Sequence, residues 1–331
     1  MISRSLRWML FVSLAAFAGT PAYAETAWDL PLVWPEGNFH VENAKAFAAA
    51  VDEATGGEVV ITVHPGGALG LKGPEILAAV RDGTVPIGEM LLPQQAAEEP
   101  LLGLAANPNL ASNHDEIALL HKHWLPHVHE RAVGHNQKFL YFVPWPTTYL
   151  YAQVPLETVE DLQALKVRTA FDALTAAYDR IGATTVQLPW GDVVPALNEG
   201  TIDAVATSAS SGVDGKFWEH FSYMYVAHFL PASNAVSVNL DAWNTLSTDH
   251  QAAIEDVAAR LQPRFWAVSE AEDALKVKIL TDSGIVIAGE LAPVLIDHVR
   301  AAMEPILDES VESIGQPAGA IVEAFRADIA D

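Results

Sequence analysis

Residues 165–207 read LKVRTAFDALTAAYDRIGATTVQLPWGDVVPALNEGTIDAVAT, and their pattern decides the fold. Three short apolar runs in this stretch are typical of buried strands, and two longer amphipathic runs between them are typical of helices. The expected strands are 165–168, 185–188 and 204–207, and the expected helices are 173–181 and 192–198. This alternating order predicts a parallel sheet with helices on its faces.

The same order of elements occurs near the N-terminus. The expected strands are 30–34, 58–63 and 85–90, and the expected helices between them are 41–54 and 74–81. This order again predicts a parallel sheet covered by helices on both faces. Two such sets indicate two domains of similar design, for which a chain of 331 residues is long enough.

A long helical pattern follows the second set. It begins after Ser247, a suitable N-cap, and runs to about residue 282, where Gly284 ends it. Pro263 lies inside the pattern and is expected to kink or divide the helix. A helix of this length in a two-domain α/β protein is expected to lie across both domains.

We therefore predict an α/β fold of two lobes with a ligand cleft between them and the long helix bracing both. The chain shows no flexible linker, so several ordered crossings should join the lobes and permit hinge motion. The first lobe is expected to contain residues 25–145 and about 235–275, and the second 146–234 and about 276–331.

The first 24 residues have the three parts of a secretory signal peptide. Arg4 and Arg7 precede an apolar stretch at 8–19, and Ala22-Tyr23-Ala24 is a suitable cleavage site. The apolar stretch is too short to span a bilayer as a stable helix, although an uncleaved anchor is the alternative. We expect cleavage before Glu25 and a periplasmic location.

Composition excludes several functions. The chain has 42 acidic and 18 basic residues and a net charge of −24, so it should repel nucleic acid and anionic lipid. It contains no cysteine, which excludes a disulfide, a thiol nucleophile and a cysteine-based metal site. An anionic ligand would need a local positive site in this acidic protein.

Arg168 is a candidate for that positive site. It ends the expected strand 165–168, and ligands of open α/β sheets bind beyond the carboxyl ends of strands. Its planar guanidinium can hold a carboxylate through two parallel hydrogen bonds. The alternative is a surface ion pair with one of the many acidic side chains.

Three motifs resemble one family. Residues 157–168, ETVEDLQALKVR, resemble a signature of TRAP-transporter periplasmic solute-binding proteins of the DctP type. The segments 182–204 and 64–70, the latter reading HPGGALG, are similar to further motifs of this family in the same order. The resemblance extends from about residue 32 to the C-terminus.

This resemblance implies a hinged, two-lobed binding protein in which Arg168 clamps the carboxylate of the ligand. It places Trp190 at an aromatic position of the cleft and Thr207 and Ser208 at positions of polar contacts. Further lining positions lie in the loop after the first strand and around the start of the second lobe, and Phe171 follows the clamp. These additional residues are Trp34, Glu36, Asn38, Trp145, Thr148 and Phe171.

Departures from the family pattern bear on the ligand. Thr148 stands where members that bind sialic acid have a second arginine, and Thr207-Ser208 replaces an acidic or amide pair. Ala164 and Ala204 replace glycines. Several aromatic residues with a single arginine suit a monocarboxylate with an apolar or aromatic body. Ordinary core packing is the alternative for each tryptophan.

A cluster of histidines allows a second hypothesis. Six histidines lie between His114 and His135, and His123 and His127 have the i, i+4 spacing of two ligands to one metal. A periplasmic metal-binding protein is therefore the alternative function. Pro126 interrupts the local helical pattern, and a solvated helix face explains the same residues. The six are His114, His121, His123, His127, His129 and His135.

The sequence contains no G-x-S-x-G, H-E-x-x-H or P-loop motif, so we expect a protein that is not an enzyme and needs no cofactor. The expected function is capture of a small organic acid in the periplasm and its delivery to the membrane subunits of a TRAP transporter. A sensor that passes its ligand to a receptor kinase and a periplasmic enzyme on the same scaffold remain rivals.

Overall fold

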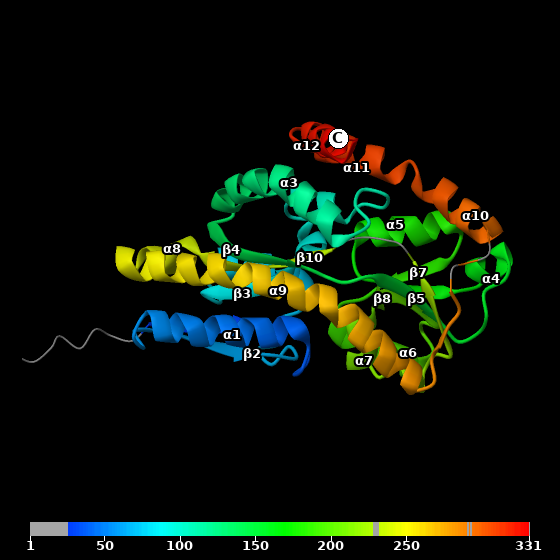
Figure 1. Cartoon of the computed structure of the whole chain (residues 1–331), viewed down its shortest axis with the longest axis horizontal. Coiled ribbons are helices and arrows are strands. Elements are labelled where there is room, and N and C mark those ends of the chain that lie inside the picture. Colours follow the sequence, from blue (N-terminus) through cyan, green and yellow to red (C-terminus); the bar gives the residue numbers. More distant parts are fainter. Residues whose placement is uncertain (1–25, 228–231, 290, 292, 331) are drawn as a thin grey trace, which may run out of the picture.

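The structure is a computed structural model that describes residues 26–227, 232–289, 291 and 293–330. The predicted signal peptide, residues 1–24, lies outside the described residues. Two lobes, each built around β-strands, lie side by side and are spanned by one long helix (Figure 1).

The first lobe begins with a small parallel sheet. Strand β1 (Thr26–Pro31) pairs with β2 (Val59–His64), and helix α1 (Phe39–Ala54) connects them. Asn38 caps α1, because its side-chain oxygen accepts a hydrogen bond of 2.9 Å from the backbone N–H of His40. This βαβ unit confirms the expected helix and second strand. The first strand begins four residues before the expected range 30–34 and ends at Pro31, so Trp34 lies in the loop that follows it.

A second sheet in this lobe corrects the sequence-based prediction. Strand β3 (Ile87–Leu91) was expected to join a parallel sheet, but it pairs antiparallel with β10 (Ser233–Asn239). The sheet order is β3-β10-β4, with β4 (Gln137–Pro144) also antiparallel to β10. The prediction of a parallel partner was wrong because β10 is distant in sequence, and a local pattern does not show which strand pairs with which.

The second lobe contains a six-stranded sheet in the order β11-β9-β5-β8-β6-β7. Strand β6 pairs parallel with both β7 and β8, as residues 165–207 predict, whereas β5 is antiparallel to both β8 and β9. The strands are β5 (Thr148–Ala152), β6 (Lys166–Thr169), β7 (Thr184–Gln187), β8 (Ala204–Ser208), β9 (Tyr223–Val226) and β11 (Val286–Ile287).

Short helices surround the two lobes. Gly200 has a φ of 69° directly after α6, a left-handed conformation that glycine adopts without steric cost. The α-helices are α2 (Ile76–Arg81), α4 (Val159–Gln163), α5 (Asp172–Ile181), α6 (Val193–Glu199), α7 (Ala209–Asp214) and α8 (Leu240–Asn244). The 3₁₀ helices are η1 (Gly73–Glu75), η2 (Leu92–Gln95), η3 (Pro100–Ala106), η4 (Trp190–Asp192) and η5 (Phe217–Glu219).

Helix α9 (Thr248–Asp282) is the long helix that the sequence predicts. The Ser247 side chain caps it by accepting a hydrogen bond of 3.1 Å from the His250 N–H. Pro263 lies inside the helix but does not divide it. Helix α9 packs against α1 and β4 in the first lobe and against α7 in the second, so it braces both lobes (Figure 1).

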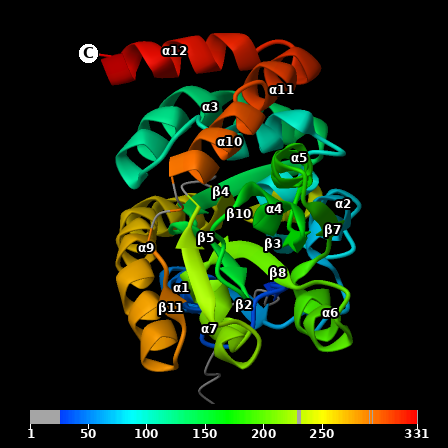
Figure 2. The same ribbon diagram turned by 90° about the vertical axis from the view of Figure 1, so that its right-hand side faces the viewer.

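The C-terminal helices form a layer on one side of the molecule (Figure 2). Helix α10 (Pro293–Met303) packs on α5, and α11 (Ile306–Ile314) packs on both α5 and η3. The last helix, α12 (Ala318–Ala330), packs on α3 (His114–Gly134) of the first lobe. The C-terminal segment therefore contacts both lobes. Among the described residues, no helix combines the length and the apolar character needed to cross a membrane.

Helix α12 offers a test of this packing. We expect Phe325→Ala to lower the free energy of unfolding by about 3 kcal/mol, since Phe325 is 1% exposed in the cluster that also contains Trp124. Ile329→Ala is the matched control, because Ile329 lies one turn away on the same helix and is 46% exposed. Urea unfolding measures the shift of the midpoint in each variant relative to the wild type. Equal shifts in the two variants would contradict this packing.

Candidate ligand-binding site

A cavity lies between the two lobes, with an empty volume of about 530 Å³ that is partly open to solvent. Its walls come from the ends of strands and from the loops that follow them, in both lobes. The lining residues are Trp34, Leu91, Trp145, Thr148, Arg168, Ala170, Phe171, Leu174, Trp190, Ala206, Thr207, Ser208, Ser211 and Ala232.

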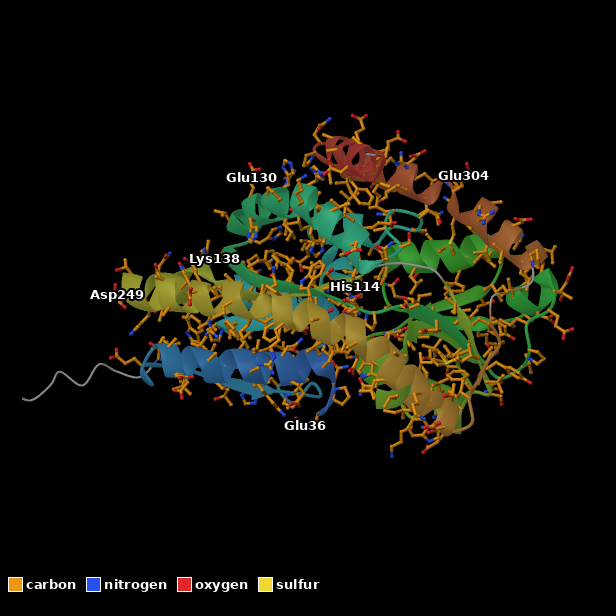
Figure 3. The ribbon with its side chains drawn as sticks, in the orientation of Figure 1. Glu36, His114, Glu130, Lys138, Asp249 and Glu304 are labelled. Carbon is orange, nitrogen blue, oxygen red and sulfur yellow. The ribbon has the colours of Figure 1, made fainter. Side chains whose placement is uncertain are left out.

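Eight of the ten residues selected from the sequence line this one cavity. They are Trp34, Trp145, Thr148, Arg168, Phe171, Trp190, Thr207 and Ser208. Asn38 and Glu36 are not among the lining residues. The Asn38 side-chain Nδ2 instead donates a hydrogen bond of 2.6 Å to Asp214 Oδ2. Glu36, from the same loop, lies at the surface beside Lys45, with which it forms an ion pair (Figure 3).

Arg168 provides the positive charge of the cavity. It lies on β6 and is 3% exposed, and its Nε and Nη2 donate hydrogen bonds of 3.0 and 2.6 Å to the Leu188 carbonyl. Burial lowers the pKa of the guanidinium to about 9, so Arg168 stays charged at neutral pH. Within the described residues, Arg168 forms no ion pair with a carboxylate. A buried cation without a counter-charge is a site for an anion.

Tryptophans from both lobes form the aromatic wall. Trp34 follows β1 in the first lobe, and its ring centroid lies 4.7 Å from that of Trp145 in an edge-to-face arrangement. The ring centroid of Trp190, on η4 of the second lobe, lies 6.1 Å from that of Trp34. The three rings form one continuous surface that faces the cavity.

The sequence did not indicate what holds these rings in place. Trp34 Nε1 donates a hydrogen bond of 3.2 Å to Glu89 Oε2 on β3, and Trp145 Nε1 donates one of 2.6 Å to Asn234 Oδ1 on β10. The Asn234 side-chain amide in turn donates to Glu89 Oε1. Glu89 and Asn234 therefore fix both indoles from behind. The only signal in the sequence was one acidic residue inside the apolar run 85–91.

Hydroxyl groups form the polar part of the cavity. Thr148 on β5 lies opposite Ser208 on the neighbouring strand β8. Ser208 caps α7, where its Oγ accepts a hydrogen bond of 3.1 Å from the Ser211 N–H and donates one of 3.2 Å to Ser211 Oγ. Thr207 completes the group. These side chains can donate to or accept from an uncharged polar part of a ligand.

Three of the hydrogen bonds made by the described residues join opposite lobes around the cavity. Two connect side chains, Asn38 to Asp214 at 2.6 Å and Lys72 Nζ to Asp192 Oδ2 at 2.8 Å. In the third, Gln94 Nε2 donates a hydrogen bond of 3.1 Å to the Ala170 carbonyl. The lobes are therefore in the closed arrangement, in which each wall of the cavity meets its counterpart.

The histidines do not form a metal site in the described part of the chain, where no group of three or more histidine, aspartate or glutamate side chains is placed to hold a metal ion. Five of the six lie on α3, which runs from His114 near the centre of the molecule to the surface at Glu130, and His135 caps the end of this helix (Figure 3). His123 Nε2 is 2.8 Å from Asp328, and His135 Nε2 is 3.3 Å from Glu99.

The fold and the cavity define a class of protein, a two-lobed solute-binding protein that encloses its ligand between the lobes. Residues 32–314 match the sequence model of a protein family described as bacterial extracellular solute-binding protein, family 7. The chain belongs to this family. The resemblance to DctP-type proteins inferred from residues 157–168 and 182–204 is confirmed. The family consists of solute-binding proteins rather than enzymes.

Solved structures with similar folds support the same class. The solute receptor DctP6 of Bordetella pertussis, described as binding pyroglutamic acid, is 30% identical, with a TM-score of 0.87 over 91% of this chain and 100% of that one. A TRAP solute-binding protein from a marine metagenome, specific for pyroglutamate, is also 30% identical, with a TM-score of 0.88 over 92% and 100% of the two chains.

A relative identified by sequence is the ectoine/5-hydroxyectoine-binding periplasmic protein UehA of Ruegeria pomeroyi. It is 23% identical over 341 residues, which cover 96% of this chain and 94% of the relative.

Glu89 gives a prediction about pH. Burial raises the pKa of Glu89 from 4.5 to about 8, and the neighbouring His40, whose Nδ1 is 3.6 Å away, has a pKa lowered by burial. Because the folded protein then binds one more proton than the unfolded chain between these values, stability should fall as pH rises from about 4.5 to about 8. We expect Glu89→Gln to remove this part of the decline, measured as urea midpoints from pH 5 to pH 8.

The matched control is Glu53→Gln, an exposed position on α1, which should keep the pH dependence of the wild type. If the urea midpoint of Glu89→Gln declined with pH as steeply as that of the wild type, Glu89 would not be the titrating group.

Proposed function

We propose that this protein captures a small monocarboxylic acid, with pyroglutamate as the first candidate, and delivers it to the membrane subunits of a TRAP-type transporter. The observation that carries the proposal is the buried Arg168, which has no carboxylate partner among the described residues and lines the cavity between the lobes. A ligand carboxylate supplies the missing counter-charge.

The geometry of Arg168 fits this role. A guanidinium has five N–H groups, and two of them donate to the Leu188 carbonyl. The Leu188 bonds fix the plane of the group and leave its Nη1 end for the ligand. A carboxylate bound there in two-point fashion forms charge-assisted hydrogen bonds, each contributing roughly 1.5–3 kcal/mol.

The lining residues favour one carboxylate over two. Arg168 is the only lysine or arginine among the residues that line the cavity in the described structure. A second carboxylate would be buried without a cation, which is strongly unfavourable. The tryptophan wall instead favours an apolar or flat ring, and the Thr148, Thr207 and Ser208 hydroxyls can bond an amide or carbonyl group on it.

Pyroglutamate satisfies these requirements, because it has one carboxylate on a small flat ring that carries an amide. Two structures that are 30% identical to this chain are described with pyroglutamate, which supports the choice. Secretion by the predicted signal peptide and release of the ligand at a TRAP-type membrane protein complete the proposal. Ligand binding favours the closed form only through its higher affinity for that form.

A ligand panel tests the substrate class. We expect refolded protein comprising residues 25–331 to bind pyroglutamate in titration calorimetry, and a hundredfold excess over the dissociation constant to stabilise it by about 2.7 kcal/mol. Succinate, with its second carboxylate, should bind at least about 100-fold more weakly. Equal affinity for succinate would refute the monocarboxylate assignment, and stabilisation by zinc alone would favour the histidine hypothesis.

The role of Arg168 is tested by substitution. We expect Arg168→Ala to weaken binding of the acid by about 100-fold or more, and Arg168→Lys to restore only part of it, because lysine keeps the charge without the planar fork. The control is Arg326→Ala, an exposed position on α12. Calorimetry measures the affinities, and circular dichroism verifies folding. Wild-type affinity in Arg168→Ala would remove Arg168 from the site.

A further inference from the structure

A second cavity adjoins the first behind Phe171. It is open to solvent, with an empty volume of about 870 Å³ that includes this open space, and it lies among η2 and η3 of the first lobe, α5 of the second lobe and α11. Phe171 lines both cavities, although its own side chain is only 5% exposed. At Phe171 the polypeptide therefore runs from the wall of the first cavity to the wall of the second.

The boundary between the cavities is formed from both lobes. On the second lobe, Ala170 lines only the first cavity and Ala173 only the second, with Phe171 between them. On the first lobe, Leu91 lines the first cavity and Pro93 the second. Gln94 follows directly and donates its hydrogen bond of 3.1 Å to the Ala170 carbonyl, which closes the boundary across the lobes.

The two cavities differ in chemistry. The first has an aromatic wall and one buried cation, whereas the second is lined by hydroxyl groups of Ser310 and Ser313 and by the acidic side chains of Asp172 and Glu309. Asn107 adds an amide that donates a hydrogen bond of 3.0 Å to Ser310 Oγ. Glu309 is paired with Arg180, so Asp172 is the acidic group that disfavours a second carboxylate here. The second cavity thus suits an uncharged, hydroxylated group.

We propose that Phe171 is a specificity-determining residue, which with the Gln94–Ala170 hydrogen bond forms a partition that limits the length of the acid held by Arg168. The inference rests on the proposed function of the first cavity. With the phenyl ring removed, the two cavities become continuous, and an acid with a longer hydroxylated tail extends into the second cavity.

The test measures the binding of ω-hydroxy carboxylic acids of three to ten carbons, and of pyroglutamate, to the wild type, Phe171→Ala and Leu174→Ala. Leu174 is the matched control because it is 2% exposed and lines the first cavity but not the second. We expect Phe171→Ala to bind the longest hydroxy acids at least about tenfold more tightly than the wild type. A gain of this size corresponds to the burial of two or three additional methylene groups of the acid. Leu174→Ala should show no such gain.

Two further arms strengthen the test. Dicarboxylic acids of the same length should gain less in Phe171→Ala than the hydroxy acids do, since their second carboxylate would meet the Asp172 carboxylate. Phe171→Val replaces Phe171→Ala if the latter does not fold. An equal gain in both variants, or tight binding of the longest acids by the wild type, would overturn the partition.

A crystal structure of ligand-free Phe171→Ala separates this inference from the proposed function. Continuous cavities in that structure support the partition, and refilling of the space by neighbouring side chains overturns it. Failure of the wild type to bind pyroglutamate and every short acid would instead refute the proposed function, and the crystal structure would still decide whether Phe171 divides the two cavities.

Discussion

The hydrogen bonds between the Arg168 guanidinium and the Leu188 carbonyl are the interaction on which the site depends. Arg168 lies opposite Val186 in the parallel pairing of β6 and β7, and Leu188 follows β7 with its N–H bonded to the Thr169 carbonyl. The register of two strands therefore fixes both the cation and its support. A slip of one residue would turn the guanidinium to the opposite face of the sheet. Trp190 follows Leu188 by two residues, so the same pairing also positions one ring of the aromatic wall.

The closed arrangement of the lobes supplies the rest of the site. Trp34 belongs to the first lobe and Trp190 to the second, so the wall is complete only when the lobes meet. The contacts between the lobes differ in environment. Lys72 and Asp192 are exposed and screened by solvent, whereas Asn38 is buried and its partner Asp214 has a pKa raised by burial to about 6. Asn38 thus acts between the lobes rather than on the cavity wall.

The sequence predicted those features that depend on local pattern or on a contiguous motif. Residues 165–207 predicted β6, α5, β7, α6 and β8, and Ser247 predicted the start of α9. The family resemblance and the position of Arg168 at a strand end identified most of the cavity wall. Long-range pairing was not predictable, which explains the error in the first sheet. The Glu89–Asn234 support was missed for the same reason, since it joins residues 145 positions apart that meet only once β3 and β10 pair.

The position of β10 at the centre of the first sheet has a consequence for how the chain folds. Residues 233–239 are needed to join β3 and β4, which have no direct pairing with each other. The first lobe therefore cannot complete its sheet until the polypeptide has passed through the second lobe and returned. Such non-local closure slows folding, because much of the chain must be ordered before these contacts form. A nascent chain with this topology therefore stays incompletely folded until most of it has been synthesised.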